Sequence, residues 1–152
     1  MSNSLLIGFG TETGNSELLA MDALKKANEF GIEAKLAGLD DVECDDLKDA
    51  DYLIIVCSTW GDGEQPDNAI DLYEAVEGLG DDELSGTKFA ILALGDTAFD
   101  LFCEAGIQWD ELLENKGGTR FYDRIDCDTD YEDEADEWID LVINKIGSSI
   151  EN

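Results

Sequence analysis

The loop after the first apolar run of the chain combines hydroxyl groups with a glycine. Unpaired backbone N–H groups at the start of a helix, joined by hydroxyl donors, form an anion site that the helix dipole favours. The loop has no lysine, so neutral donors would bind the anion, which suits the single phosphate of a mononucleotide. An ordinary helix cap would use the same residue types, and this loop alone leaves both interpretations open. The loop and the helix start read Thr11, Glu12, Thr13, Gly14, Asn15 and Ser16.

Three better-known sites fit this region poorly. The spacing Gly8-x-Gly10-x-x-x-Gly14 is one residue too long for the dinucleotide fingerprint Gly-x-Gly-x-x-Gly. A Walker loop needs a lysine directly after its last glycine, and none follows Gly14. A receiver domain needs acidic residues after its first strand and an aspartate after its third. This chain has glycine, threonine and serine at those places.

A tryptophan follows the most continuous apolar run, residues 52–58. A tryptophan between a small polar residue and a Gly-x-Gly turn is poorly placed for a core role. Its ring is well placed to cover a flat aromatic ligand, and the glycines would let the backbone approach that ligand closely. The alternative is an aromatic side chain exposed on a turn. The loop reads Ser58, Thr59, Trp60, Gly61, Asp62 and Gly63.

A second aromatic residue follows the apolar run 88–94. Gly95 and Asp96 come directly after Leu94, and Phe99 stands at the expected start of a helix. Phe99 would either join the core or form the wall opposite Trp60 around the same flat ring. In the second case, the two aromatic loops and the phosphate loop would form one site.

The elements that must position these loops follow from hydrophobic patterning. Short apolar runs alternate with segments of helical periodicity, which is typical of a parallel α/β sheet. Such a chain favours a doubly wound five-stranded sheet of order 2-1-3-4-5 with helices on both faces. Ligands bind such sheets outside the carboxyl ends of strands one and three. Strands are expected at 4–9, 32–37, 52–58, 88–94 and 119–125. Helices are expected at 16–30, 68–78, about 99–115 and about 131–146, with a short helical turn around Leu47.

Helical periodicity also predicts which side chains face the core. In the segment 68–78, Ile70, Tyr73 and Val76 are expected to point inward. Gly31 is expected to end the helix 16–30. The apolar stripe expected on the last helix consists of Ala135, Trp138, Ile139, Val142 and Ile146.

The charge balance limits the possible partners. The chain has 38 acidic and 9 basic residues, for a formal net charge of -29. Such a surface repels nucleic acid and anionic lipid, whereas a basic protein or a salt-rich medium suits it. No apolar run approaches the roughly 20 residues that cross a bilayer, and the first residues lack the pattern of a signal peptide. We expect no membrane contact, a cytoplasmic location and one domain, residues 1–152.

Cysteine and histidine usage argues against metal chemistry. Cys44, Cys57, Cys103 and Cys127 are far apart, without a Cys-x-x-Cys pair. We expect the first three to be buried or idle thiols, while the distance of Cys127 from any ligand stays open. The chain has no histidine, which removes the usual general base and the commonest metal ligand. No metal site and no hydrolytic centre are expected.

The loops together resemble those of the flavodoxin family. Residues 11–15 are similar to the flavodoxin phosphate loop. Residues 58–69, 94–103 and 117–128 resemble the FMN domain of diflavin reductases such as the sulfite reductase flavoprotein. The resemblance covers nearly the whole chain and implies a flavodoxin-like fold with FMN as the cofactor. The last strand lacks the insertion of long-chain flavodoxins, which implies the short-chain type.

The resemblance assigns a role to each loop. Residues 11–16 would hold the FMN phosphate, and Gly61 would lie beside the N5 atom of the flavin. Trp60 and Phe99 would stack on the two faces of the flavin ring, at positions where tyrosine is common in diflavin domains. Asp128 would lie near the edge of the ring. The implied cofactor-binding residues are Thr11, Glu12, Thr13, Gly14, Asn15, Ser16, Ser58, Thr59, Trp60, Gly61, Asp62, Gly63, Leu94, Gly95, Asp96, Phe99, Phe102, Cys103 and Asp128.

The resemblance implies an electron-transfer protein rather than an enzyme. The chain lacks the FAD and NADPH modules of a diflavin reductase, so we expect a free-standing, monomeric, low-potential carrier that depends on a separate reductase. Reductase and acceptor redox proteins would dock on an acidic flavin rim. Two other functions stay open: an NAD(P)H-quinone reductase on the same fold, and a non-redox module without flavin. The rim acids are Asp62, Glu64, Asp67, Asp96 and Asp100.

Overall fold

A parallel sheet forms the centre of the structure. A computed structural model describes residues 4–10, 15–58, 65, 67–80, 82–95, 103–128 and 131–151. The strands follow the order β2-β1-β3-β4-β5, with β6 also paired to β4, and every pairing is parallel. The predicted doubly wound order is therefore confirmed. The strands are β1 (Ser4–Gly10), β2 (Glu33–Gly38), β3 (Tyr52–Ser58), β4 (Lys88–Leu94), β5 (Thr119–Arg120) and β6 (Ile125–Cys127).

The prediction of one continuous fifth strand at 119–125 is wrong. Lys88 pairs with Thr119 and Leu92 pairs with Ile125. These pairs lie four residues apart on β4 but six apart on the partner, so two extra residues form a bulge between β5 and β6. Neighbouring residues of a regular strand point to opposite faces. Phe121 and Tyr122 instead pack on the same side of the sheet, which a bulge permits.

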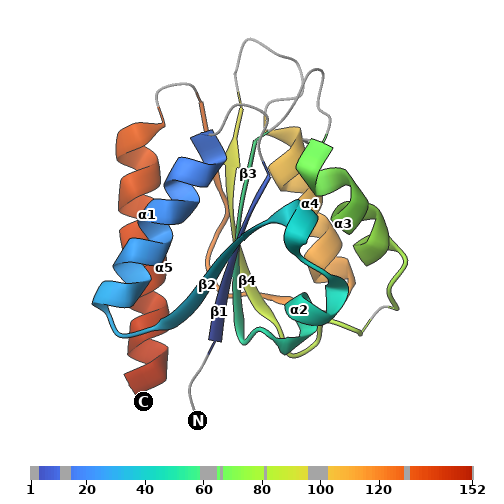
Figure 1. Cartoon of the computed structure of the whole chain (residues 1–152), viewed down its shortest axis with the longest axis horizontal. Helices are drawn as coiled ribbons and strands as arrows, with labels where there is room; N and C mark the ends of the chain where they lie inside the picture. Colours follow the sequence, from blue (N-terminus) through green and yellow to red (C-terminus); the bar gives the residue numbers. More distant parts are fainter. Residues whose placement is uncertain are drawn as a thin grey trace.

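Helices cover both faces of the sheet (Figure 1). Helices α1 (Asn15–Glu29) and α5 (Glu132–Glu151) lie side by side on one face. Gly31, with φ 74°, ends the first of them, as expected. The other face carries the short 3-10 helix η1 (Leu39–Asp41), α2 (Cys44–Asp49), α3 (Asp67–Glu77) and α4 (Glu104–Asn115).

Helix α4 begins later than predicted. The expected start near residue 99 would make Cys103 part of the helix, but this residue has φ 55° and ψ 23°, a left-handed conformation. A right-handed helix cannot pass through such a residue. Cys103 therefore caps the helix, and Glu104 is its first residue.

The core has two parts, one under each helical layer. Strands β3 and β4 are buried almost throughout, which explains their continuous apolar runs. The predicted stripe on α5 is confirmed, since all five side chains are buried. The inward position of Ile70 is wrong, because this side chain is 37% exposed. Val76 is buried, as predicted, and Tyr73 is partly buried against the core. Ala69 and Leu72 complete the buried face, and Ile70 lies off this face.

The cysteines are free thiols. Cys57 and Cys103 are buried, as predicted, and Cys44 is half-buried. Cys127 is also buried. Within the described ranges, no helix combines the length and the apolar composition that crossing a bilayer requires.

Candidate functional site

The carboxyl ends of four strands meet at one edge of the sheet. Gly10 of β1 pairs with Cys57 of β3, which pairs with Ala93 of β4, and Leu94 pairs with Cys127 of β6. Helix α1 begins at the same end of the molecule (Figure 1). The predicted loops continue the chain from these strand ends, so the expected convergence of the strand ends is confirmed.

The described residues include part of the predicted site. Three of these residues lie in elements that begin or end at this edge, namely Ser16, Ser58 and Leu94, and the backbone of Asn15 begins α1. Three more lie directly next to such elements, namely Gly95, Cys103 and Asp128. The roles of the remaining residues stay predictions. Those outside the described residues are Thr11, Glu12, Thr13, Gly14, Thr59, Trp60, Gly61, Asp62, Gly63, Asp96, Phe99 and Phe102.

Ser16 has a buried hydroxyl group without a partner. Its side chain is 0% exposed, and Oγ has no hydrogen-bond partner in the described structure. Leaving a buried polar group unsatisfied costs about 1–3 kcal/mol. Ser16 lies in the first turn of α1, where backbone N–H groups also lack helical partners. The hydroxyl therefore fits a ligand acceptor such as a phosphate oxygen.

Gly95 leaves no room for a side chain at the end of β4. A Cβ at this position would lie 2.7 Å from the backbone nitrogen of Cys103. The Gly95 N–H donates to the Cys127 carbonyl at 2.9 Å. Gly95 is thus held between the end of β6 and the start of α4, and its predicted proximity to the cofactor is consistent with this edge position.

Cys103 directs its thiol toward the sheet. Its Sγ lies 3.5 Å from both the Ala93 and the Cys127 carbonyl oxygens. Burial raises the pKa of the Cys103 thiol to about 12. Burial likewise raises the pKa of the Cys127 thiol to about 11, helped by the charges of Glu134 and Asp126. Both thiols are protonated at neutral pH, and a cofactor contact of Cys103 stays a prediction.

Two side chains that the sequence did not single out connect this edge to the helices. The Asn68 amide of α3 donates to the Phe9 carbonyl at 3.1 Å. Gln65 is buried and bonds to α4 through both atoms of its amide. A polar residue in a polar loop gives no sign of burial, so patterning could not have identified Gln65.

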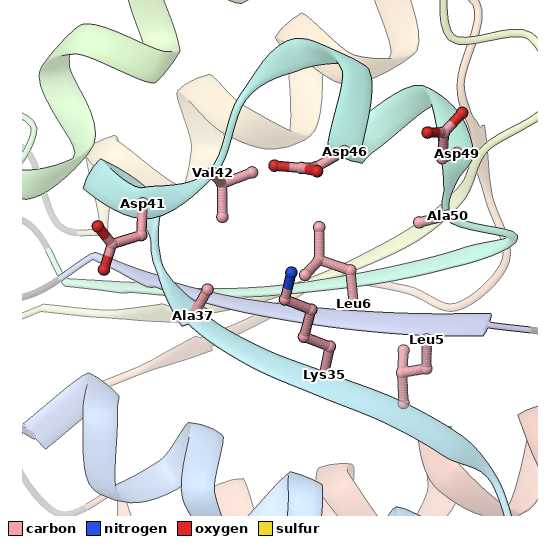
Figure 2. Close-up of a pocket in the computed structure, with 9 residues that line it drawn as sticks. All are labelled: Leu5, Leu6, Lys35, Ala37, Asp41, Val42, Asp46, Asp49 and Ala50. Atoms are coloured by element: carbon pink, nitrogen blue, oxygen red, sulfur yellow. The ribbon is translucent and has the colours of Figure 1, made fainter.

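The site at the carboxyl edge is separate from a cavity of about 140 Å³ between β1, β2 and α2 (Figure 2). Leu6 and Val42 point into this cavity from opposite sides, and Lys35 and Asp46 lie beside it. Leu6 lies near the amino end of β1. None of the predicted cofactor-binding residues lines this cavity, so it belongs to another part of the molecule.

Comparison with known proteins adds to these observations. The family model described as Flavodoxin matches residues 7–138. The chain is 36% identical over 149 residues to the sulfite reductase [NADPH] flavoprotein alpha-component of Bacillus subtilis, covering 98% of this chain and 25% of that protein. Identity to the corresponding Vibrio cholerae protein is 38% over 143 residues, covering 94% and 23%. The chain therefore spans about a quarter of the length of these relatives.

Solved flavodoxin structures match over nearly the whole of the chains that they contain. The Streptococcus pneumoniae TIGR4 flavodoxin superposes with a TM-score of 0.86 at 27% identity, covering 97% of this chain and 99% of that one. Flavodoxin 2 from Bacillus cereus superposes with a TM-score of 0.82 at 29% identity, covering 98% and 99%.

Proposed function

The chain belongs to the flavodoxin family, whose cofactor is FMN, and from this membership we propose that it carries single electrons at low potential. A reductase would supply the electrons and acceptor redox proteins would take them. The reductase relatives are about four times as long, so their complete reaction is not assigned to this chain. We propose a carrier, not an enzyme, that works as a monomer in the cytoplasm. Four free thiols suit such a reducing compartment.

The hydroxyl of Ser16 is the observation that best supports cofactor binding. It is buried, has no partner among the described residues and lies at the start of α1, where the phosphate of FMN would accept its hydrogen bond. The backbone N–H groups of the first turn would add further donors. Bound FMN would supply the redox chemistry, and the protein would supply its position and its electrostatic surroundings.

Tight packing at the strand ends supports a cofactor site with a rigid border. Gly10 is crowded by Cys57 Sγ and Ala69 Cβ, at 3.0 and 3.2 Å from a Cβ built there. Ser58 Oγ donates to the Gly10 carbonyl at 3.3 Å, which joins the ends of β1 and β3. These contacts would hold the strand ends in place on either side of the cofactor.

The net charge of -29 supports docking of basic partners. Acidic side chains at a docking surface accelerate association with a basic protein, and salt weakens this effect. The proposed rim acids lie outside the described side chains, so the proposal rests on the composition of the whole chain. Electron transfer to a basic acceptor should slow as ionic strength rises. Rates that do not change with salt would contradict rim docking.

The first test concerns FMN binding by Ser16→Ala. Apoprotein titrated with FMN should show about tenfold weaker binding in the variant, because one hydrogen bond to a charged acceptor is lost. The free energy of unfolding of the apoprotein should stay the same or rise, because the unsatisfied hydroxyl is gone. Ser85→Ala, at an exposed turn, is the control and should change neither value.

The second test concerns the absence of enzyme activity. The purified protein should be yellow, release FMN and leave NADPH unoxidised until a separate reductase is added. Steady NADPH oxidation by the protein alone would contradict the carrier function and favour a reductase. A colourless protein that does not bind added FMN would contradict the whole proposal.

A further inference from the structure

The side chain of Gln65 makes four polar contacts inside the protein. Its Oε1 accepts a hydrogen bond from the Trp109 Nε1 at 2.9 Å and lies 3.6 Å from the Cys57 Sγ. Its Nε2 donates to the Ala105 carbonyl at 3.0 Å and to the Gln108 Oε1 at 3.1 Å. A carboxamide with partners on both atoms has one preferred orientation, so these contacts fix residue 65 against α4.

Trp109 gives this contact a rigid base. The tryptophan side chain is fully buried on α4, and its ring packs edge-on against Tyr73 of α3 at a centroid distance of 5.1 Å. Because the interior is close-packed, the Trp109 ring has no room to move with Gln65 if that residue shifts. The indole N–H therefore marks a fixed point to which Gln65 is bound.

Gln65 directly follows the segment of the sequence that contains Trp60 and Gly61. Six residues, 59–64, separate Gln65 from Ser58, which is paired in the sheet with Leu94. The sheet holds one end of this segment, and α4 holds the other end through the amide of Gln65. The thiol of Cys57 also connects the amide to the end of β3, next to Gly10.

The start of α4 holds the other aromatic segment as well. Residues 96–102 run from Gly95 to Cys103, and Cys103 caps α4 while it contacts the carbonyl oxygens of Ala93 and Cys127. Ala105 and Trp109 belong to the first two turns of the same helix. One rigid element therefore anchors an end of each segment that carries a predicted stacking residue.

We propose that Gln65, bound by Trp109, is a positioning residue for the flavin site. Its side chain holds residue 65, which follows the segment 59–64, at a fixed place on α4, and the residue that caps this helix follows the segment 96–102. An apolar residue of similar size would fill the same space without fixing the orientation of the chain. Ligand sites need supporting residues whose positions are fixed by hydrogen bonds. This inference rests on the proposed FMN binding.

The test compares Gln65→Leu with a control that loses a similar buried hydrogen bond elsewhere. Thr87 is 2% exposed, and its Oγ1 donates to the Leu47 carbonyl at 2.8 Å, near the start of β4. Thr87→Val should lower the stability of the apoprotein but keep the wild-type Kd for FMN. Gln65→Leu should raise this Kd about tenfold and shift the midpoint potential of the bound flavin.

A second variant separates the hydrogen bond from the packing. Trp109→Phe removes the indole N–H while it keeps an aromatic ring, and it should raise the Kd for FMN in the same direction as Gln65→Leu. The double variant should bind FMN no more weakly than Gln65→Leu alone, because Gln65→Leu already removes the hydrogen bond that Trp109→Phe removes.

Three outcomes overturn the proposal in distinguishable ways. A wild-type Kd and potential in Gln65→Leu, with FMN bound normally by the wild type, would show that Gln65 does not position the site. An equal rise of the Kd in Thr87→Val would assign the effect to general destabilisation. A wild-type protein that does not bind FMN would overturn the proposed function together with this inference.

Discussion

On one face of the sheet, the buried contacts of α1 and α5 are made by aliphatic and aromatic side chains, and Lys26 of α1 pairs with Asp136 and Asp140 of α5 only at the surface. On the other face, α4 adds buried polar groups to its packing. The buried polar residues Gln65, Thr87 and Asp110 all lie on the α2–α4 side. Among the described residues, Ser16 is the exception on the α1 side, and it lies at the candidate site. Trp138 of α5 makes a single bond, from its indole N–H to the Asp123 carbonyl at 2.9 Å.

This difference separates stability from positioning. Apolar packing has no preferred direction, and it stabilises in proportion to the area buried. Hydrogen bonds and ion pairs fix particular atoms relative to one another. We therefore expect changes in the α1–α5 layer to affect the stability of the fold, and changes around α4 to affect the arrangement of the loops as well.

The largest effect is expected in the apolar layer, from Ile139→Ala. Ile139 is 1% exposed on α5, so the substitution leaves a cavity and should lower the free energy of unfolding by about 2–5 kcal/mol. The Kd for FMN should stay unchanged at temperatures where the variant is folded. Urea unfolding of the apoprotein and an FMN titration measure the two quantities.

Leu141→Ala is the matched control on the same helix. This side chain is 47% exposed, so its loss should change the stability by no more than about 0.5 kcal/mol. An FMN affinity that falls with Ile139→Ala while the protein is fully folded would contradict the separation of stability from positioning.

A smaller effect is expected around α4, from Asp110→Asn. The buried carboxylate binds Arg120 Nε at 2.8 Å and Arg124 Nη1 at 2.6 Å, one arginine on each side of the extra residues between β5 and β6. The arginines are partly exposed and keep Glu114 and Asp126 as partners. We expect a loss of about 1–3 kcal/mol, less than for a fully buried pair.

Glu114→Gln tests whether burial makes the difference. Glu114 contacts the other side of Arg120 at 3.1 Å but is 58% exposed, so its loss should cost less than about 1 kcal/mol. Urea unfolding of both variants gives the comparison. An equal loss of unfolding free energy in the two variants would show that burial does not strengthen the contribution of Asp110 to stability.

The effect that is smallest at neutral pH and grows only in alkali concerns the thiols, which occur in both layers. The folded-state pKa values of Cys103 and Cys127, about 12 and about 11, lie above the value near 8.5 of an unfolded thiol. Between about pH 9 and 11 the unfolded state binds fewer protons, so the stability falls as pH rises. Each thiol contributes up to about 1.4 kcal/mol per pH unit.

Cys127→Ala isolates this contribution. Relative to the wild type, the variant should show a shallower loss of stability between pH 9 and 11, and the same slope below pH 8. Cys44→Ala is the comparison, because Cys44 is only half-buried. Parallel curves of stability against pH for Cys127→Ala and the wild type would mean that the thiol has the same pKa in the folded and in the unfolded protein.

Patterning predicted the elements best where burial is complete. The strands at 52–58 and 88–94 have the predicted bounds, since both are covered on two faces and read as continuous apolar runs. It failed where a neighbour decides the local structure. Phe121 and Tyr122 pack on the same side of the sheet and break the fifth strand, and nothing in the sequence shows which face will accept both rings.

The sequence by itself determined the fold, the family and the loops that meet at the carboxyl edge, because these depend on periodicity and on local motifs. Only the tertiary structure decided that Gln65 bonds to Trp109, 44 residues away, and that the buried hydroxyl of Ser16 has no partner within the described part of the chain. The tertiary structure also decided that Cys103 adopts a left-handed backbone conformation and packs closely against Gly95. Such contacts depend on how distant elements pack together, which the pattern of side chains along the chain does not specify.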